Sequence, residues 1–523
     1  MGTLRALVSS PVIVYLASLI GGCAAYGSHP NSPAQGGSKW VEVSSPRFRV
    51  VSDLPPEEAE GVARELEQGV EAIEQVAFEH ARSRLEPTTV IAFQSASDFH
   101  AFMPDRVDGR FYRRLPGDLE PSSVLVLYGS LDESSRITCL HELTHDLFDL
   151  NFGPAPPWLG EGWAQYFSTI ELETDRIRVG AALPHLTFTQ DAQAVMARAE
   201  DGSRVLAMPV DLVAPPSQLL GMQREAFYSS ALKQSEEGTA LYLGAWALVH
   251  LLHDGPEPYP TRFKRFMEAA RHAPLQSAWE SAFAGLSRAE FDHDFRVYLA
   301  KRELATFEYH RHAAGSALTV SKRALSEREV RLYWARLSEE GASDAQALSD
   351  LNAAITADAS SPEARYFRGV YWLHEKQLAA AERDFLEAAR VAPNEPRYLL
   401  GVLVIRIEQA QRSTSTHATI GDPVMLAAER LAPVAVSAMQ LRVLALLYDD
   451  SGQLERALTF AQRAVARAPI DSWCLDAEAR VLAHLGRTRE ALEIQRAAVA
   501  FVPESADAPE IARHLSELEA AAR

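Results

Sequence analysis

The chain has 523 residues, enough for roughly two to four domains, and 47% of them are hydrophobic, which is ample for packed cores. Its 70 acidic and 51 basic residues give a formal net charge of −19. This acidity argues against nucleic acid as a partner, which requires a basic surface, and against electrostatic attraction to anionic lipid head groups. The three cysteines are Cys23, Cys139 and Cys474. A Cys139–Cys474 disulfide is conceivable but not favoured, so no covalent staple of the fold is expected.

The first residues have the pattern of a targeting segment. Arg5 supplies a small positive region, and an apolar stretch follows over residues 12–20. This stretch is too short to be a good membrane span. The sequence from Leu19 to Cys23 resembles a bacterial lipobox, with small residues just before the cysteine. We therefore predict a lipoprotein signal peptide over residues 1–22.

The lipobox resemblance implies lipid attachment to Cys23, which anchors the chain to a membrane without spanning it. Residues 23–39 are then predicted to be a flexible tether, because Gly, Ser, Pro and Asn dominate from Tyr26 onward. Ala24 is not Asp, which by analogy favours the outer membrane of the bacterial cell envelope, on its periplasmic or surface face. The alternative is an ordinary secretory signal cleaved near Ala25.

The next region alternates strand and helix patterns. Period-two alternation of apolar and polar residues predicts strands, and Pro followed by acidic residues predicts the start of an amphipathic helix. Two short strands are expected at residues 40–43 and 48–51, followed by a long helix at residues 55–84 and a strand at residues 88–93. A short helix is expected to begin at Ser97, and a buried strand to span residues 123–128. The edge of such a sheet could line a substrate cleft and accept a peptide as an extra strand.

The most informative motif is the sequence His-Glu-Leu-Thr-His at residues 141–145. Residues four apart share one face of a helix, so His141 and His145 can hold one zinc ion. Glu142 lies beside them and can act as the general base on a zinc-bound water. Glu161, sixteen positions after His145, is the natural third ligand. Two histidines, a glutamate and a water would form an open catalytic site rather than a closed structural one.

The surroundings of this motif favour a helix. Leu140, Leu143 and Leu147 recur at helical spacing and give it an apolar face, and Thr138 or Ser135 could cap its start. The alternative is an exposed amphipathic helix whose histidines are solvated.

A second helix is expected to carry Glu161. The run of prolines from Pro154 to Pro157 forces an extended segment, and Glu161 then lies at the start of the next helix. The small neighbours Gly162 and Ala164 allow close packing of this helix on others. The alternative for Glu161 is that it caps a neighbouring helix.

The pairing of His-Glu-Leu-Thr-His with Trp-Leu-Gly-Glu-Gly-Trp-Ala resembles the peptidase MA-like gluzincins, bacterial zinc metallopeptidase domains often found beside tetratricopeptide repeats. The resemblance covers roughly residues 40–305, with its specific core at residues 139–167. It implies that His141, His145 and Glu161 are zinc ligands and that Glu142 is the catalytic base. It also implies an α+β, zincin-like fold with a small mixed sheet and active-site helices.

One position departs from thermolysin-type sites. There an acidic residue four positions after the ligand glutamate orients a ligand histidine, whereas this chain has Gln165. An amide would not polarise an imidazole as a carboxylate does. Asp146, Asp149 or a backbone carbonyl are the other candidates for this role.

The region after the motif begins with a small hairpin over residues 171–179 and continues with an irregular insert over residues 181–235, either a cleft wall or a lid. A strong helix is predicted over residues 238–253. Tyr242 on that helix falls where the family tends to keep an aromatic hydroxyl, which could stabilise an oxyanion. The alternative, that Tyr242 only packs in the core, is favoured.

Two further histidines, His250 and His253, lie on the same predicted helix. We expect them to be a core-edge and a surface residue rather than ligands. Helices over residues 261–273 and 287–307 close the domain.

The last part of the chain repeats every 34 residues. Gly452 and Gly486 are 34 positions apart, and so are Ala354 and Ala388. This period is typical of tetratricopeptide repeats, in which helix pairs stack into a superhelix. Residues 412–422 interrupt the phase, so two pairs of repeats could flank an insert. The array either binds a peptide or protein partner or only spaces the first domain.

Together these patterns predict a zincin-like domain over residues 40–310 and an all-α tetratricopeptide-type domain over residues 320–523. The leading hypothesis is a lipid-anchored zinc metallopeptidase that acts on a protein or peptide substrate and recruits a protein through its repeats. The alternatives are a zinc-binding interaction scaffold with weak or no turnover, and a hydrolase of cell-wall peptide.

Overall fold

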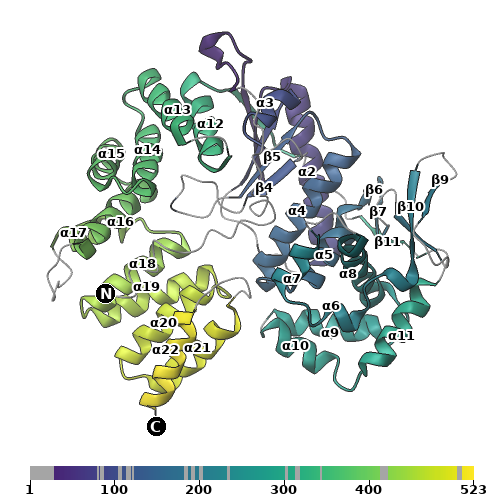
Figure 1. Cartoon of the computed structure of the whole chain (residues 1–523). Coiled ribbons are helices and arrows are strands. Elements are labelled where there is room, and N and C mark those ends of the chain that lie inside the picture. Colours follow the sequence, from purple (N-terminus) through teal and green to yellow (C-terminus); the bar gives the residue numbers. More distant parts are fainter. Residues whose placement is uncertain are drawn as a thin grey trace.

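The computed structural model describes residues 29–78, 82, 87–103, 109–112, 119, 123–181, 186–189, 195–198, 204–231, 236–271, 273–300, 304, 306–311, 318–341, 344–412, 422–502 and 509–522. A part that contains strands and helices is followed by an arc of helices that runs from α12 to the C-terminal end (Figure 1). The predicted signal peptide and Cys23 lie outside the described residues.

The strands are short, and most of them lie in the first part of the chain. Their bounds are β1 Val41–Ser44, β2 Phe48–Ser52, β3 Thr88–Phe93, β4 Gly109–Tyr112, β5 Val124–Tyr128, β6 Glu171–Leu172, β7 Arg176–Val179, β8 Leu186–Thr189, β9 Val195–Arg198, β10 Arg204–Pro209, β11 Phe307–His310 and β12 Ser321–Ala324.

The helices of the first part surround these strands. They are η1 Pro33–Gln35, α2 Pro56–Ala77, α3 Ala96–His100, α4 Glu133–Phe152, α5 Pro157–Ser168, η2 Val210–Leu212, α6 Pro216–Leu219, α7 Arg224–Ala231, α8 Glu236–Asp254, α9 Tyr259–Ala270, α10 Leu275–Ala282 and α11 Arg288–Leu299. The α+β pattern predicted for this part of the chain is therefore present, although α10 was not predicted.

The main sheet has the strand order β12-β1-β2-β3-β5-β4. The pairs β2–β3 and β3–β5 are parallel, whereas β12, β1 and β4 each pair antiparallel with their neighbours. The strands β1, β2, β3 and β5 lie at or within one residue of their predicted positions. Among the described strands, β4 forms one edge of this mixed sheet, and it lies against α4.

Both faces of the sheet are covered. Because side chains alternate along a strand, Leu125 and Leu127 join the core shared with α2 and α4, whereas Val124 and Val126 join a second core on the other face. That second core contains Trp334 of α12, which spans Glu327–Gly341. The position of α4 against the sheet is thus set by burial of one helix face in the larger core.

The sheet does not end at the predicted domain boundary of residue 310. Strand β12 pairs with β1, in the register Val41 to Ala324 and Ser44 to Ser321. Helix α12 then covers one sheet face and also packs on α13, Asp344–Ala357, the next helix of the array. Helix α12 therefore belongs to both parts of the chain, whereas the predicted boundary between residues 310 and 320 assigned it to the second part alone.

The predicted tether over residues 23–39 is wrong for its described portion. Arg331 of α12 donates hydrogen bonds to Ser32 Oγ and Gln35 Oε1, both at 2.9 Å, and pairs with buried Asp350 at 2.6 Å. His29 also lies 2.9 Å from Asp350. The polar residues that suggested flexibility instead satisfy a buried guanidinium.

Two predicted helices end earlier than expected. Helix α2 ends at Ala77, because Phe78 adopts an extended backbone and is buried; Arg84 lies outside the described residues. Helix α11 ends at Leu299, and Phe307 begins β11, which pairs antiparallel with β7. Strands β6 and β7 form the predicted hairpin, and β11 adds a third strand to it.

The insert over residues 181–235 is not irregular. It contains a three-stranded sheet of order β8-β10-β9, followed by η2, α6 and α7. Phe227 of α7 is fully buried in the main core, so this helix is packed on the domain. The prolines that suggested irregular chain instead lie at strand and helix ends, where a missing N–H costs little.

The remaining helices form an all-α array of stacked pairs. They are α13, α14 Pro362–His374, α15 Leu378–Val391, α16 Pro396–Arg412, α17 Asp422–Leu431, α18 Ala438–Asp450, α19 Leu454–Arg467, α20 Ser472–His484, α21 Thr488–Ala500 and α22 Pro509–Ala521. Helices α18 and α20 begin 34 residues apart, at Ala438 and Ser472, which confirms the predicted period. The interruption between residues 412 and 422 joins α16 to α17, which pack together, so the array continues across it.

The arc meets the first part of the chain at points beyond α12. Leu119, from the connection between β4 and β5, is buried in the core of the helical array, and its backbone N–H donates to the Tyr366 hydroxyl at 3.4 Å. A Cβ added to Gly153, at the end of α4, would lie 3.5 Å from the side chain of Ile470. The helical array therefore contacts the domain that carries the histidine motif.

Candidate metal centre

Helix α4 presents the two histidines. Its cap is Asp132, whose carboxylate accepts a hydrogen bond from the Ser135 N–H at 2.8 Å, so the predicted caps Ser135 and Thr138 are wrong. A carboxylate at this position also interacts favourably with the positive N-terminal end of the helix dipole. The leucine face is buried as predicted, which leaves His141 and His145 half-buried on another side of the helix.

Helix α5 brings Glu161 to the histidines. It begins at Pro157, so Glu161 lies beyond its first turn, and its side chain is fully buried. A Cβ on Gly162 would lie 2.3 Å from the carbonyl oxygen of Ala245 in α8, and a Cβ on Gly160 would lie 3.7 Å from the His145 ring. Gly162 thus allows α5 to pack tightly on α8, as predicted, whereas the Gly160 distance is an ordinary contact that a side chain could make.

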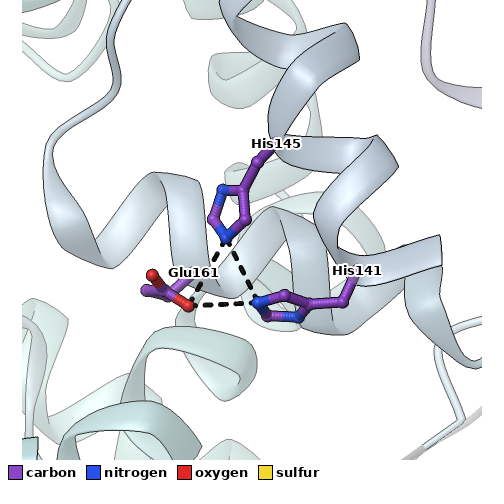
Figure 2. Close-up of side chains that lie close together, drawn as sticks. All are labelled: His141, His145 and Glu161. Carbon is purple, nitrogen blue, oxygen red and sulfur yellow. Dashed lines mark hydrogen bonds and ion pairs between the residues drawn. The ribbon is translucent and has the colours of Figure 1, made fainter. Parts of the chain in front are cut away.

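The three predicted ligands point toward one another (Figure 2). The Nε2 atoms of His141 and His145 are 3.2 Å apart. Glu161 Oε2 lies 3.4 Å from His141 Nε2 and 3.6 Å from His145 Nε2. One potential ligand atom from each residue lies within 4.8 Å of the others.

The chemistry of this cluster fits a divalent metal. Glu161 Oε2 is buried next to the two imidazole Nε2 atoms, but it accepts no well-formed hydrogen bond from a described residue. A buried carboxylate oxygen that lacks a hydrogen bond is costly unless a cation or a donor reaches it. Two imidazoles and one carboxylate are also the protein ligands of a known class of catalytic zinc sites. His141, His145 and Glu161 therefore form a donor set that suits zinc.

The charges in the cluster reinforce one another. Burial would raise the pKa of Glu161, but the nearby imidazoles of His145 and His141 lower it well below its usual range. Burial likewise opposes protonation of His141, yet contact with Glu161 raises its pKa above the ordinary value. Glu161 is thus held as a carboxylate, the form in which it can bind a cation.

The second oxygen of Glu161 has a partner that the sequence did not suggest. The hydroxyl of Tyr228 in α7 donates a hydrogen bond of 2.7 Å to Glu161 Oε1. Tyr228 lies 67 positions after Glu161, inside the insert. No motif spacing links the two residues, because only the folding of the insert onto α5 and α8 brings them together.

Tyr242 lies near the cluster and is half-buried. With His141, Gln165 and Leu243 it lines an open cavity of about 260 Å³ between α4, α5 and α8. Burial raises the pKa of the Tyr242 phenol above its usual range, and the charges of Glu161 and Glu142 raise it further. Tyr242 therefore keeps its proton, which is the form that donates a hydrogen bond to an anion.

The Gln165 side chain does not take the place of the missing acidic residue. Its amide donates to the backbone carbonyl of Tyr242 at 3.2 Å and so links α5 to α8. Glu142, the predicted base, is half-exposed next to His141 on α4. The role of Asp146 or Asp149 in orienting an imidazole stays a prediction.

The remaining histidines of α8 lie in another network. His250 is fully buried, rather than at the core edge, and its ring contacts the Tyr298 hydroxyl at 2.8 Å and the Gly180 carbonyl at 3.1 Å. His253 pairs with Asp254 at 2.6 Å. Neither belongs to the metal-ligand cluster. Cys139 and Cys474 are both buried and free.

The chain was compared with known proteins. No protein-family model matches the chain, and no curated protein matches it.

Similar solved structures are tetratricopeptide repeat proteins. The protein YrrB, described as having an unusual peptide-binding site, is 15% identical, with a TM-score of 0.29 over 36% of this chain and 90% of its own. A protein from Thermus thermophilus is also 15% identical, with a TM-score of 0.29 over 36% of this chain and 98% of its own. One from Parabacteroides merdae is 13% identical, with a TM-score of 0.27 over 56% of this chain and 98% of its own. TM-scores this low support no argument about this chain, and the gluzincin resemblance of the first domain stays a prediction.

Proposed function

We propose that the chain is a zinc-dependent metallopeptidase that hydrolyses peptide bonds. The observation that carries this proposal is the convergence of His141, His145 and Glu161 on one point, where the buried Glu161 Oε2 faces both imidazoles. A purely structural zinc site normally has four protein ligands, whereas three leave a position open for water or substrate. Glu142 follows His141 on the same helix, and its proposed role is that of the general base.

Each nearby side chain has a distinct role in the proposed reaction. A bound zinc ion supplies Lewis acidity and lowers the pKa of water toward neutrality. Glu142 accepts a proton from the attacking water and passes it to the leaving amine. Tyr242 keeps its phenolic proton and donates a hydrogen bond to the oxyanion of the tetrahedral intermediate.

The sheet offers a way to bind an extended peptide. Among the described strands, β4 lies at the edge of the sheet next to α4, so its outer backbone groups could pair with a substrate strand. Backbone pairing holds a peptide largely independently of its side chains. The cavity between α4, α5 and α8 adjoins His141 and is large enough for one substrate side chain, which would provide selectivity.

We further propose that the enzyme is lipid-anchored at the cell envelope through Cys23 and that its helical array binds a protein substrate or partner. The pattern that supports the anchor is the lipobox-like sequence from Leu19 to Cys23. No helix within the described ranges is long and apolar enough to cross a membrane. An array of helix pairs presents a broad curved surface, which is typical of protein recognition.

The test compares the wild-type chain with Glu142→Gln on an unstructured protein substrate, with and without a chelator. The amide is nearly isosteric but accepts no proton, so the variant should bind zinc as the wild type does and cleave at least about 100-fold more slowly. Zinc content by mass spectrometry is the matched control for site integrity. Full proteolysis by Glu142→Gln would refute the mechanism.

A second candidate is a zinc-binding scaffold with little or no turnover. It is favoured by Gln165, whose amide bonds the Tyr242 carbonyl where thermolysin-type sites have an acidic residue that orients a ligand histidine. This candidate predicts about one zinc per chain but no chelator-sensitive cleavage by the wild type. Cleavage that a chelator stops and zinc restores would exclude it.

A further inference from the structure

The insert supplies a hydrogen bond to the candidate metal centre. We infer that Tyr228 is a positioning residue, which directs Glu161 toward the two histidines and couples the insert to the occupancy of the metal site. This inference rests on the proposed function, because it assumes that His141, His145 and Glu161 bind a metal. Its basis is the 2.7 Å hydrogen bond from the Tyr228 hydroxyl to Glu161 Oε1.

The hydrogen bond distinguishes the two carboxylate oxygens. Oε1 is held by Tyr228, whereas Oε2 faces His141 Nε2 at 3.4 Å and His145 Nε2 at 3.6 Å. Because Glu161 is fully buried, bulk water cannot replace the tyrosine as a donor. Loss of the hydroxyl would leave Oε1 without this donor and free the carboxylate to rotate. Tyr228 therefore favours the one orientation that completes the ligand set.

Helix α7 is itself held in place on the domain. Phe227 is fully buried and packs edge-to-face on Tyr228 and on Tyr242, with ring centroids 5.3 and 5.4 Å apart. The guanidinium of Arg224 lies over the Tyr228 ring at 5.1 Å. One aromatic cluster thus joins the insert to both Glu161 and Tyr242. Through α7, the insert is a wall of the metal centre rather than a freely moving lid.

The first test measures zinc affinity of the full chain by competition with a chelating dye. Removing a partner that orients a metal ligand typically weakens binding about 10-fold to 100-fold, which is the loss expected for Tyr228→Phe. Tyr259→Phe is the matched control, because Tyr259 also donates a 2.7 Å hydrogen bond to a carboxylate, that of Asp294, away from the site. Its zinc affinity should stay within about twofold of wild type.

Two readouts separate positioning from general stability. The absorption spectrum of the Co²⁺-substituted protein reports ligand geometry, and it should change in Tyr228→Phe but not in Tyr259→Phe. Zinc should slow hydrogen exchange in α7 of the wild type and have a smaller effect in Tyr228→Phe. Phe keeps the ring contacts with Phe227, so the Tyr228→Phe variant is expected to stay folded, which its melting temperature checks.

The outcomes are distinguishable. A wild-type chain that binds no zinc would overturn the proposed function and this inference with it. A wild type that binds zinc, beside a Tyr228→Phe variant with equal affinity and an unchanged Co²⁺ spectrum, would overturn the inference alone. An equal loss of affinity in Tyr259→Phe would also overturn it, because the effect would then be one of stability.

Discussion

The contact between α5 and α8 gives the sharpest structural prediction. A Cβ at residue 162 would lie 2.3 Å from the carbonyl oxygen of Ala245 and 2.7 Å from Val249 Cγ2. The distance from this Cβ to the carbonyl oxygen is about 1 Å shorter than an ordinary contact, so Gly162→Ala must push the two helices apart. The Ala245 carbonyl is part of the α8 backbone, so it cannot rotate away as a flexible side chain can.

The magnitude follows from two opposing terms. Overpacking of a core typically costs about 1–3 kcal/mol. Alanine regains about 1 kcal/mol of helix propensity over glycine. The difference between these two terms gives an expected destabilisation of about 0–2 kcal/mol for Gly162→Ala. Zinc affinity should fall as well, since Glu161 is its neighbour on α5.

The control is Gly61→Ala in α2. Gly61 is exposed, and a Cβ there would meet nothing within 4 Å, so this variant should gain about 0.5–1 kcal/mol. Thermal and denaturant unfolding, with and without zinc, measure both changes. If Gly162→Ala proves as stable as wild type and binds zinc equally well, the tight helix contact is not a determinant of the site.

Three further changes have defined outcomes. Tyr242→Phe should lower kcat by about 100-fold with little change in KM, because the hydroxyl is proposed to act only on the oxyanion; steady-state kinetics with unchanged kcat would make Tyr242 a core residue. A chain that begins at residue 40 should melt several degrees below one that begins at residue 28, because Arg331 loses Ser32 and Gln35 as partners, and equal melting temperatures would contradict the docked N-terminal segment. The hydrogen bond to Asp449 raises the pKa of His484 in the folded chain. The stabilisation that protonated His484 gives to the folded state is therefore present below about pH 6.5 and is lost as pH rises through the folded-state pKa. Unfolding of wild type and His484→Gln should therefore differ more at about pH 5.5 than at about pH 8, and a constant difference would refute this coupling.

Much of the fold was predictable because its signals are local. Strand β3 occupies its predicted residues, and the 34-residue period appears directly in the starts of α18 and α20. The errors arose where distant partners decide the structure. Residues 29–37 have the composition of a linker, but Arg331, nearly 300 positions away, orders them by hydrogen bonding. Phe307 continues a helical pattern, yet pairing with β7 makes it a strand.

The candidate site divides in the same way. The sequence alone determined that His141 and His145 share a helix face and that Glu161 follows on a second helix, because helical spacing depends only on neighbouring residues. Tertiary structure decided that Glu161 Oε2 points at both imidazoles, since that orientation requires α5 to pack closely between α4 and α8. It also decided that Tyr228 bonds the other oxygen of Glu161. Such a contact depends on how the insert folds back over the helices, and no spacing in the sequence encodes the position of a side chain brought in from another element.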